Sequence, residues 1–148
     1  MHNYILKKDD GSLVINTDSK LPDSYILEIK PEDRYSKYKN HIKYIDCCYL
    51  DKDDNLQIDL VKALGNKLES LENKSQIKIR ELRKMLTEAS ALGRTDVVEE
   101  IIQTIKEITS FLKSDFSKVN DVNDIDQLIC PELTLNYEEL YSEKLYGI

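Results

Sequence analysis

Tryptophan is absent from the sequence, and glycine and proline are scarce, with four and three residues among 148. Scarce Gly and Pro argue against a loop-rich fold, because these residues mark turns and irregular segments. No hydrophobic run reaches the length that spans a membrane, and the start, MHNYILKKDDG, lacks the apolar run of a signal peptide. We therefore expect a cytoplasmic protein with no membrane partner.

Cysteine is also scarce, and its pattern is informative. Cys47, Cys48 and Cys130 are odd in number, two are adjacent, and no Cys-x-x-Cys occurs. This favours reduced thiols over a disulfide framework, and together with only two histidines it does not make a zinc site. We predict that Cys47 and Cys48 are buried as small apolar groups on a strand, in preference to a redox pair.

Positive charge is in deficit, with 21 basic against 28 acidic residues and a net charge of −7. Non-specific binding of nucleic acid needs a basic surface that displaces counterions, so no nucleic-acid partner is expected. A composition of 33% charged and 41% hydrophobic residues is typical of a soluble folded chain. A chain of this length buries about two-thirds of its unfolded surface.

Residues 1–59 are predicted to form a small α+β unit. The segments NYILKK and SLVINT flank Asp10-Gly11, a dipeptide suited to a tight hairpin because both residues tolerate positive φ. A third strand is predicted over 24–30 and a short helix over 31–41. Two further strands, IKYIDCCYL and NLQID, are predicted on either side of the acidic turn DKDD.

Residues 60–113 are predicted to form a long antiparallel helical hairpin with its turn near 93–96. Gly93 suits the left-handed residue after a helix, and Asp96 with Glu99 resembles a capping box, with Thr95 as the other cap candidate. Apolar residues at three- and four-residue spacing mark the first helix, namely Val61, Leu64, Leu68, Leu71, Leu82, Met85, Ala89 and Leu92. The second helix has the apolar face Val98, Ile101, Ile102, Ile105, Ile108 and Leu112.

Two features weaken the first helix of this hairpin. The stripe is interrupted in ENKSQIK, where Ser75 and Lys78 take the seam positions and a bend or a change of packing partner is expected. Gly65 costs roughly 1 kcal/mol relative to Ala unless something packs close to it. Residues 114–148 are predicted to be an irregular segment with short C-terminal helices. The fold class predicted for the whole chain is α+β.

The stretch DKDDNLQIDLVK, residues 51–62, resembles a calcium-binding loop. Asp51, Asp53, Asn55 and Asp59 place oxygen atoms at the first, third, fifth and ninth positions. However, the sixth position needs Gly and has Leu56, and the twelfth needs a bidentate carboxylate and has Lys62. We therefore predict a solvated hairpin turn and no metal ion.

No signature of catalysis is present. The chain lacks a phosphate-binding glycine loop, a Gly-x-Ser-x-Gly elbow and a His-Glu-x-x-His motif, and His41 has no recognisable partner in its segment. We expect no enzymatic activity, no catalytic residue and no cofactor.

Protein binding is the remaining class of function. Tyr137, Leu140, Tyr141 and Leu145 lie on one face of a predicted last helix, which could dock into a partner's groove or fold back on the chain's own helices. Two helices beside a small sheet could also leave an apolar stripe open, with Leu82 and Met85 as candidates. An open stripe could equally join copies of the chain in a homo-oligomer.

The order of these features resembles the small tail-assembly proteins of tailed bacteriophages and prophages. The residues that carry the resemblance are NLQIDLVKAL leading into KIRELRKML, with Arg80, Arg83 and Leu86, then ALGRTDVVEEIIQTIKEI and the closing DIDQLICPEL. The turn has Gly93-Arg94-Thr95-Asp96 where that family has a tight Gly-Asp, and Cys130 stands in place of a frequent Trp. The resemblance covers roughly residues 43–133.

The resemblance implies a non-enzymatic assembly chaperone or adaptor whose partner is a tail fibre or another tail protein. It would act in the host cytoplasm, and it would be found in the virion if it stays bound. The alternatives are a minor structural component retained in the particle and a host-directed regulatory protein. A calcium-responsive binding module is a further alternative.

Overall fold

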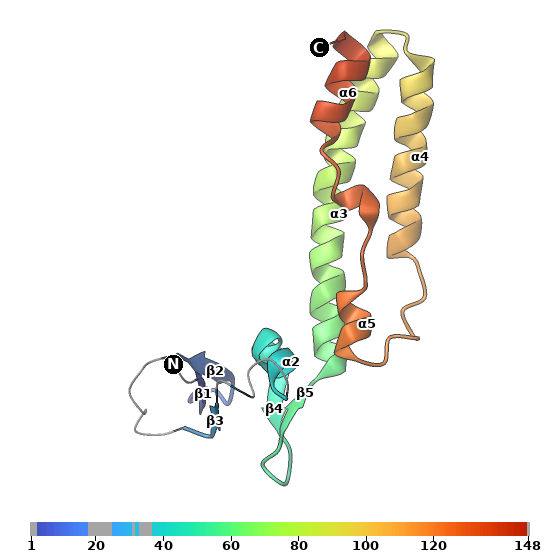
Figure 1. Cartoon of the computed structure of the whole chain (residues 1–148). Helices are drawn as coiled ribbons and strands as arrows, with labels where there is room; N and C mark the ends of the chain where they lie inside the picture. The colour runs from blue at the N-terminus through green and yellow to red at the C-terminus, as the bar shows by residue number, and fades with distance from the viewer. Residues whose placement is uncertain (1–2, 18–24, 31, 33–36, 148) are drawn as a thin grey trace. The chain divides into compact units, whose positions relative to one another are not determined.

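The chain has an α+β fold, as the sequence predicts: a small antiparallel sheet at the N-terminus, then a long helical hairpin and short C-terminal helices (Figure 1). The computed structural model describes residues 3–17, 25–30, 32 and 37–147. It divides into two compact units, Met1–Gly65 and Asn66–Ile148, which are described separately below.

The first unit is built on an antiparallel sheet with the strand order β2-β1-β3. The strands are β1 (Asn3–Lys7), β2 (Leu13–Asn16) and β3 (Leu27–Ile29). Strand β3 is shorter than the strand predicted over 24–30, of which residue 24 lies outside the described residues. Ile5 of the central strand pairs with Ile15 on one side and with Leu27 on the other. Ile5, Leu13 and Ile29 are buried and form the core of this unit.

The predicted hairpin between β1 and β2 is present, with a wider turn than a two-residue loop. Only Gly11 takes a positive φ, of 89°, whereas Asp10 turns its carboxylate onto the backbone N–H of Ser12 at 2.9 Å. A second bond joins the N–H of Lys8 to the carbonyl of Ser12. The Asp-Gly dipeptide therefore correctly predicts the hairpin, but its two residues act differently: Gly11 supplies the positive φ, and the Asp10 side chain accepts a hydrogen bond within the turn.

The strand predicted over 42–50 is wrong for most of its length. The chain forms α2 (Lys39–Lys43) and the 3-10 helix η1 (Ile45–Cys47), and only β4 (Cys48–Leu50) is a strand. Tyr38, Ile42 and Ile45 are four and three residues apart, and this helical spacing brings all three against the core of the sheet. Of the helix predicted over 31–41, residues 31 and 33–36 lie outside the described residues.

The second unit contains the helical hairpin. Helix α3 (Leu60–Ala91) enters it from the first unit and continues without interruption through the predicted weak point, where the buried Ser75 hydroxyl donates to the carbonyl of Leu71 at 2.7 Å. Helix α4 (Thr95–Leu112) follows after a short turn. Gly93, with a φ of 67°, and Arg94 donate their N–H groups to the carbonyls of Ser90 and Ala89, which is a Schellman motif.

The predicted capping box at the start of α4 is wrong. Arg94 is the N-cap residue, and no side chain caps the helix. The Asp96 carboxylate is drawn away because the Arg94 guanidinium donates to both of its oxygens, at 3.2 and 3.1 Å. This ion pair also lowers the pKa of the Asp96 carboxyl.

The C-terminal residues form a returning segment that follows the hairpin from the end of α4 back toward the α3–α4 turn (Figure 1). It contains α5 (Val122–Asp126), the 3-10 helix η2 (Pro131–Leu133) and α6 (Tyr137–Tyr146). Helix α4 packs closely on η2 and on α6. Asn136 caps α6 by accepting from the N–H of Glu139, and Gly147 ends it in the left-handed conformation.

One hydrophobic core joins α3, α4 and the returning segment. Its buried members are Leu82, Met85, Ala89, Val97, Ile101, Ile108, Cys130, Tyr137 and Tyr141. Among the described helices, none is both long enough and apolar enough to cross a membrane.

The two glycines of the hairpin should respond to the same substitution with opposite signs. Gly93→Ala forces a side chain into the left-handed region and should lower the free energy of unfolding by about 1–2 kcal/mol. Gly65 lies inside α3 and has no atom within 4 Å of an added Cβ, so Gly65→Ala should raise it by roughly 0.5–1 kcal/mol. Urea denaturation of both variants measures this, and equal shifts of one sign would contradict the assigned conformations.

Candidate functional site

The acidic turn is a hairpin loop between β4 and β5 (Leu56–Ile58), as predicted. The Asp51 carboxylate is occupied by the loop itself: it accepts from the N–H groups of Asp53 and Asn55, both at 2.9 Å, and from Gln57 Nε2 at 3.1 Å. These hydrogen bonds lower the pKa of the Asp51 carboxyl, and the bond from the Asn55 N–H has the largest effect. Asp59 leaves the loop to cap α3, accepting from the N–H of Lys62. Within the described part of the chain, no cluster of three or more His, Cys, Asp or Glu side chains could hold a metal ion.

Cys48 and His41 are close in space but are not arranged as a nucleophile and its base. The Cys48 thiol points to the backbone carbonyls of His41 and Tyr44, at 3.5 and 3.3 Å. Burial raises its pKa to about 11, the opposite of what an activated thiol needs. The Nδ1 atom of His41 is buried without a hydrogen-bond partner among the described residues, and the ring edge contacts Tyr38. Cys47 is buried as predicted, although in η1 and not on a strand.

The residues predicted to bind a partner meet at one end of the hairpin, mostly in its interior. Leu82, Met85, Tyr137 and Tyr141 are buried in the common core, and Leu145 packs against it. Of the six, only Leu140 is exposed. The C-terminal helix has folded back on the chain's own helices, which is the alternative that the sequence left open.

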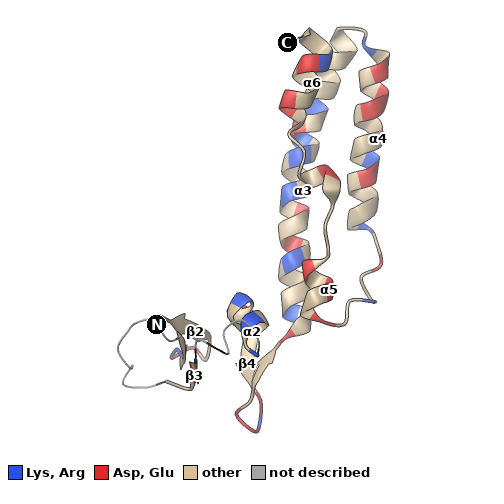
Figure 2. Cartoon of the chain, in the orientation of Figure 1, with Lys and Arg blue, Asp and Glu red and all other residues tan. Residues whose placement is uncertain are grey.

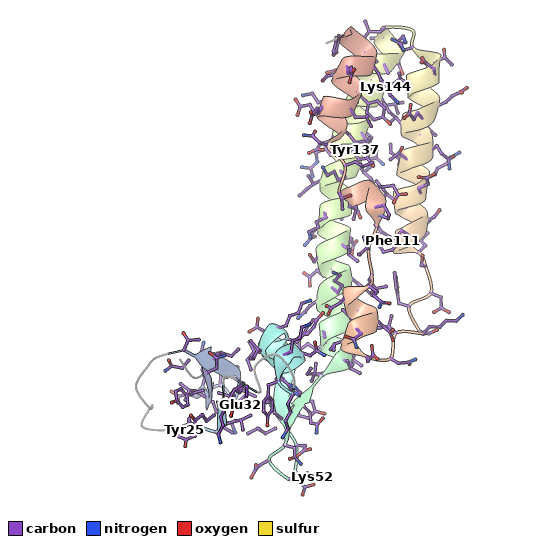
Figure 3. The ribbon with its side chains drawn as sticks, in the orientation of Figure 1. Tyr25, Glu32, Lys52, Phe111, Tyr137 and Lys144 are labelled. Carbon is purple, nitrogen blue, oxygen red and sulfur yellow. The ribbon has the colours of Figure 1, made fainter. Side chains whose placement is uncertain are left out.

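Two tyrosines dominate the contact between α6 and the hairpin. Tyr137 and Tyr141 are each 1% exposed, and their rings stack with centroids 6.0 Å apart. Lys78 of α3 lies over the ring of Tyr137 and Lys144 over that of Tyr141, at 5.9 and 5.5 Å from the centroids. Tyr137 and Lys144 lie near opposite ends of α6 (Figure 3). The Tyr137 hydroxyl donates to the carbonyl of Glu132 at 2.6 Å, and burial raises its pKa to about 12.

Polar contacts hold both ends of α6. Before its start, Lys78 Nζ donates to the carbonyl of Leu135 at 3.0 Å. Near its end, Arg94 Nη1 donates to the carbonyl of Lys144 at 2.7 Å, while Lys144 Nζ pairs with the Glu100 carboxylate at 2.8 Å. These contacts come from both helices of the hairpin, so they fix the position of α6 along it.

Shallow grooves flank α6 on both sides. One groove, of about 280 Å³, lies between α3 and α6 and has Met85, Tyr141 and Leu145 on its floor. Its rim carries Glu81, Lys84, Glu88 and Glu138. The other lies between α4, η2 and α6, with Glu100, Glu107 and Glu132 around it. The side of the hairpin that carries α6 is therefore filled with tyrosine and leucine and bordered by carboxylates.

The opposite side of the hairpin has no such cover. On α3, Glu81, Met85 and Glu88 line the groove beside α6, so helical spacing places Ile79, Arg83 and Leu86 on the side away from it. On α4, Glu100, Thr104 and Glu107 line the α6 side, which places Val98, Ile102 and Ile105 on the other. We call this surface the uncovered face: Ile79, Leu86, Val98, Ile102 and Ile105.

The uncovered face is accessible and bordered by positive charge. Ile102 is 39% exposed, and the other four members are half-buried against the core. Gln76, Ile79, Arg80 and Arg83 line an open hollow at its α3 edge. Among the described residues, neither Arg80 nor Arg83 has a hydrogen bond or an ion pair through its side chain. Within the described residues of Asn66–Ile148, η2 and α6 line the grooves on the other side of the hairpin.

The sequence contained a signal for the uncovered face. The apolar stripe of α4 includes both Ile101 and Ile102, and both Val98 and Ile105, so it is wider than one packing partner requires. Spacing alone did not show which part of the stripe the returning segment would cover. Leu82 and Met85, named as candidates for an open stripe, lie under α6 instead.

Comparison with known proteins identified no relative: no family model, no curated protein and no solved structure matches the chain.

The burial of Tyr141 should make it far more important for stability than its neighbour on the same helix. Tyr141→Ala removes a buried ring and should lower the free energy of unfolding by about 3–5 kcal/mol. Tyr146 is exposed and its hydroxyl donates one hydrogen bond, to the Glu88 carboxylate, so Tyr146→Ala should cost no more than about 1 kcal/mol. Urea denaturation followed by circular dichroism compares them, and similar losses would mean that α6 is not docked as described.

The Asp51 carboxylate should organise its turn in a pH-dependent way. Because its pKa is lowered from the ordinary 3.8, its contribution to stability is complete above that value and is lost as the pH falls through the lower, folded value. Asp51→Ala should accelerate hydrogen exchange of the Asp53 and Asn55 amides, whereas Asp53→Ala should leave the Asn55 amide unchanged. A carboxyl titration by NMR at or above 3.8 for Asp51 would contradict this arrangement.

Proposed function

We propose that this chain is a non-enzymatic adaptor that binds another protein on the uncovered face and assists the assembly of phage or prophage tail fibres. It acts in the host cytoplasm before the particle is complete. The uncovered face itself is the observation that carries the proposal.

Apolar side chains from two neighbouring helices are open to solvent on this face. Burial of such surface against a partner is favourable by about 25 cal/mol for each Å² removed from water. Contiguous apolar patches on a folded chain mark interaction sites more often than isolated exposed residues do. Ile102 is the most exposed residue of this face, so burial against a partner would remove the most apolar surface from water at this residue.

The returning segment supports the proposal because it occupies the other side of the hairpin. Tyr137 and Tyr141 fill that side, so a partner could reach Leu82 only if α6 were displaced. Such a displacement would expose two large buried rings. The uncovered face demands no such rearrangement, and most pre-organised complexes form with little movement of the backbone.

The tail-fibre part of the proposal rests on the resemblance seen in the sequence. Arg80, Arg83 and Leu86, which carry that resemblance in the first helix, all lie on or beside the uncovered face. The residues that suggest the family are thus among those available to a partner. An assembly chaperone of this kind would cover apolar surface on a fibre subunit until the fibre is built.

The proposal predicts a complex that one substitution breaks. Co-expression with a tail-fibre subunit from the same genome should yield a complex and more soluble fibre, and Ile102→Glu should abolish both, because it places a charge within the interface. Ile77→Glu is the matched control, since Ile77 is 55% exposed on α3 but lies outside the uncovered face. Pull-down and the soluble fraction of fibre measure the outcome.

The absence of a complex with the unaltered chain would contradict the proposal, as would an equal loss with Ile77→Glu. Mass spectrometry of purified particles separates the two roles that the complex could have. A chaperone should be missing from the particle, whereas a retained structural component should be present at a fixed copy number.

A further inference from the structure

We propose that the uncovered face is a docking site for an acidic amphipathic helix of the partner protein. This inference rests on the proposed function, and it adds the chemistry of the segment that is bound.

The dimensions of the face match one short helix. Ile79 and Leu86 are seven residues apart on α3, and Val98 and Ile105 are seven apart on α4. Each pair spans two turns, about 10 Å along the helix axis. A third helix with apolar residues at positions i, i+3, i+4 and i+7 would place them between these two rows. An extended strand would leave its backbone donors and acceptors unpaired against two helices.

The chain contains an internal example of such docking. Helix α6 has 10 residues and lies against α3 and α4 from the other side of the hairpin. It buries Tyr137 and Tyr141, four residues apart, and carries Glu138, Glu139 and Glu143 among its exposed positions. The hairpin therefore already holds one short helix that buries two tyrosines and whose charged residues are predominantly acidic (Figure 2).

Basic side chains of the hairpin hold α6 in place, and basic side chains also border the uncovered face. Lys78 and Arg94 donate to backbone carbonyls at the two ends of α6. Arg80 and Arg83 stand at the α3 edge of the uncovered face, and their side chains make no bond to any described residue. A guanidinium presents two parallel N–H donors that fit a carboxylate, so these arginines favour Glu or Asp on the bound helix.

The charge around the face sets the orientation of the bound helix. On α4, helical spacing places Glu99 and Lys106 at the outer edge, where their charges cancel. The positive charge therefore lies on the α3 edge alone, although the whole chain carries a net charge of −7. We expect the acidic side of the bound helix to face α3 and its neutral side to face α4.

Fluorescence anisotropy with labelled peptides and the full-length chain tests this inference. The probe is a 15-residue amphipathic peptide with Leu at i, i+3, i+4 and i+7, Glu along the side expected to face α3, and Ala or Gln at the other positions. The comparison peptides are the same sequence with Lys in place of Glu, and a scrambled sequence of the acidic composition. The variants are Arg80→Glu with Arg83→Glu, and, as a matched control, Lys74→Glu with Lys84→Glu, which changes the charge of α3 equally at exposed positions outside the face.

The acidic amphipathic peptide should bind more tightly than both comparison peptides. The arginine double variant should weaken it by about tenfold or more, because attraction across the interface becomes repulsion, and Ile102→Glu should also weaken it. The lysine double variant should change it by no more than about twofold. Equal binding of the Lys peptide or of the scrambled peptide would overturn the inference, and so would equal effects of the two double variants.

A second copy of the chain is the competing occupant. If sedimentation shows a dimer that Ile102→Glu converts to a monomer, the face belongs to self-association and the inference fails. Failure of the two proposals is distinguishable. A fibre complex that needs Ile102 but no binding of acidic peptides would refute the acidic helix alone, whereas peptide binding without a fibre complex would refute the tail-fibre role alone.

Discussion

The burial of Tyr137 and Tyr141 against the helical hairpin is the contact on which the second unit depends. Helices α3 and α4 are both amphipathic, yet much of their shared core is completed by residues of the returning segment. The rings of Tyr137 and Tyr141 are almost completely buried, and they pack α6 into the core that α3 and α4 share. Without them, Met85, Ala89 and Ile101 would lose the side chains that close the core above them, and the hairpin would have two open sides.

This docking divides the hairpin into two unlike faces. The covered face has tyrosine and leucine inside and mainly carboxylates at its edges. Lys78 and Arg94 donate hydrogen bonds to backbone carbonyls at the two ends of α6. The uncovered face has isoleucine, leucine and valine from both helices, and at its edge two arginines whose side chains bond no described residue. Burial of apolar side chains and hydrogen bonds from basic side chains hold α6 on the covered face. The uncovered face has apolar and basic side chains of the same kinds, and a partner segment would bind them in the same way.

The long, periodic elements could be predicted from the sequence, and the short ones could not. The α3–α4 hairpin follows from apolar spacing and from Gly93, which local rules read correctly. The strand over 42–50 failed because Ile42 and Ile45 pack at helical spacing against a sheet distant in sequence. The predicted cap of α4 is wrong because the Arg94 guanidinium binds the Asp96 carboxylate. The same guanidinium donates to the carbonyl of Lys144, 50 residues away, which local sequence rules do not include. For the candidate site, the sequence showed an apolar stripe on each helix, but which part of the stripe α6 covers depends on tertiary packing. Leu82 and Met85, the two residues named as candidates for an open stripe, belong to the core that α6 completes.

The most direct test of this account is the measurement of NOEs from the ring protons of Tyr141 in the isolated chain. Docking predicts NOEs to methyl groups on both helices of the hairpin, such as those of Met85 on α3 and Thr104 on α4, and no NOEs from that ring to Ile102 on the opposite face. A Tyr141 ring with random-coil shifts and no such NOEs would show that α6 is undocked. The hairpin would then have two open faces, and the assignment of a single binding face would be wrong.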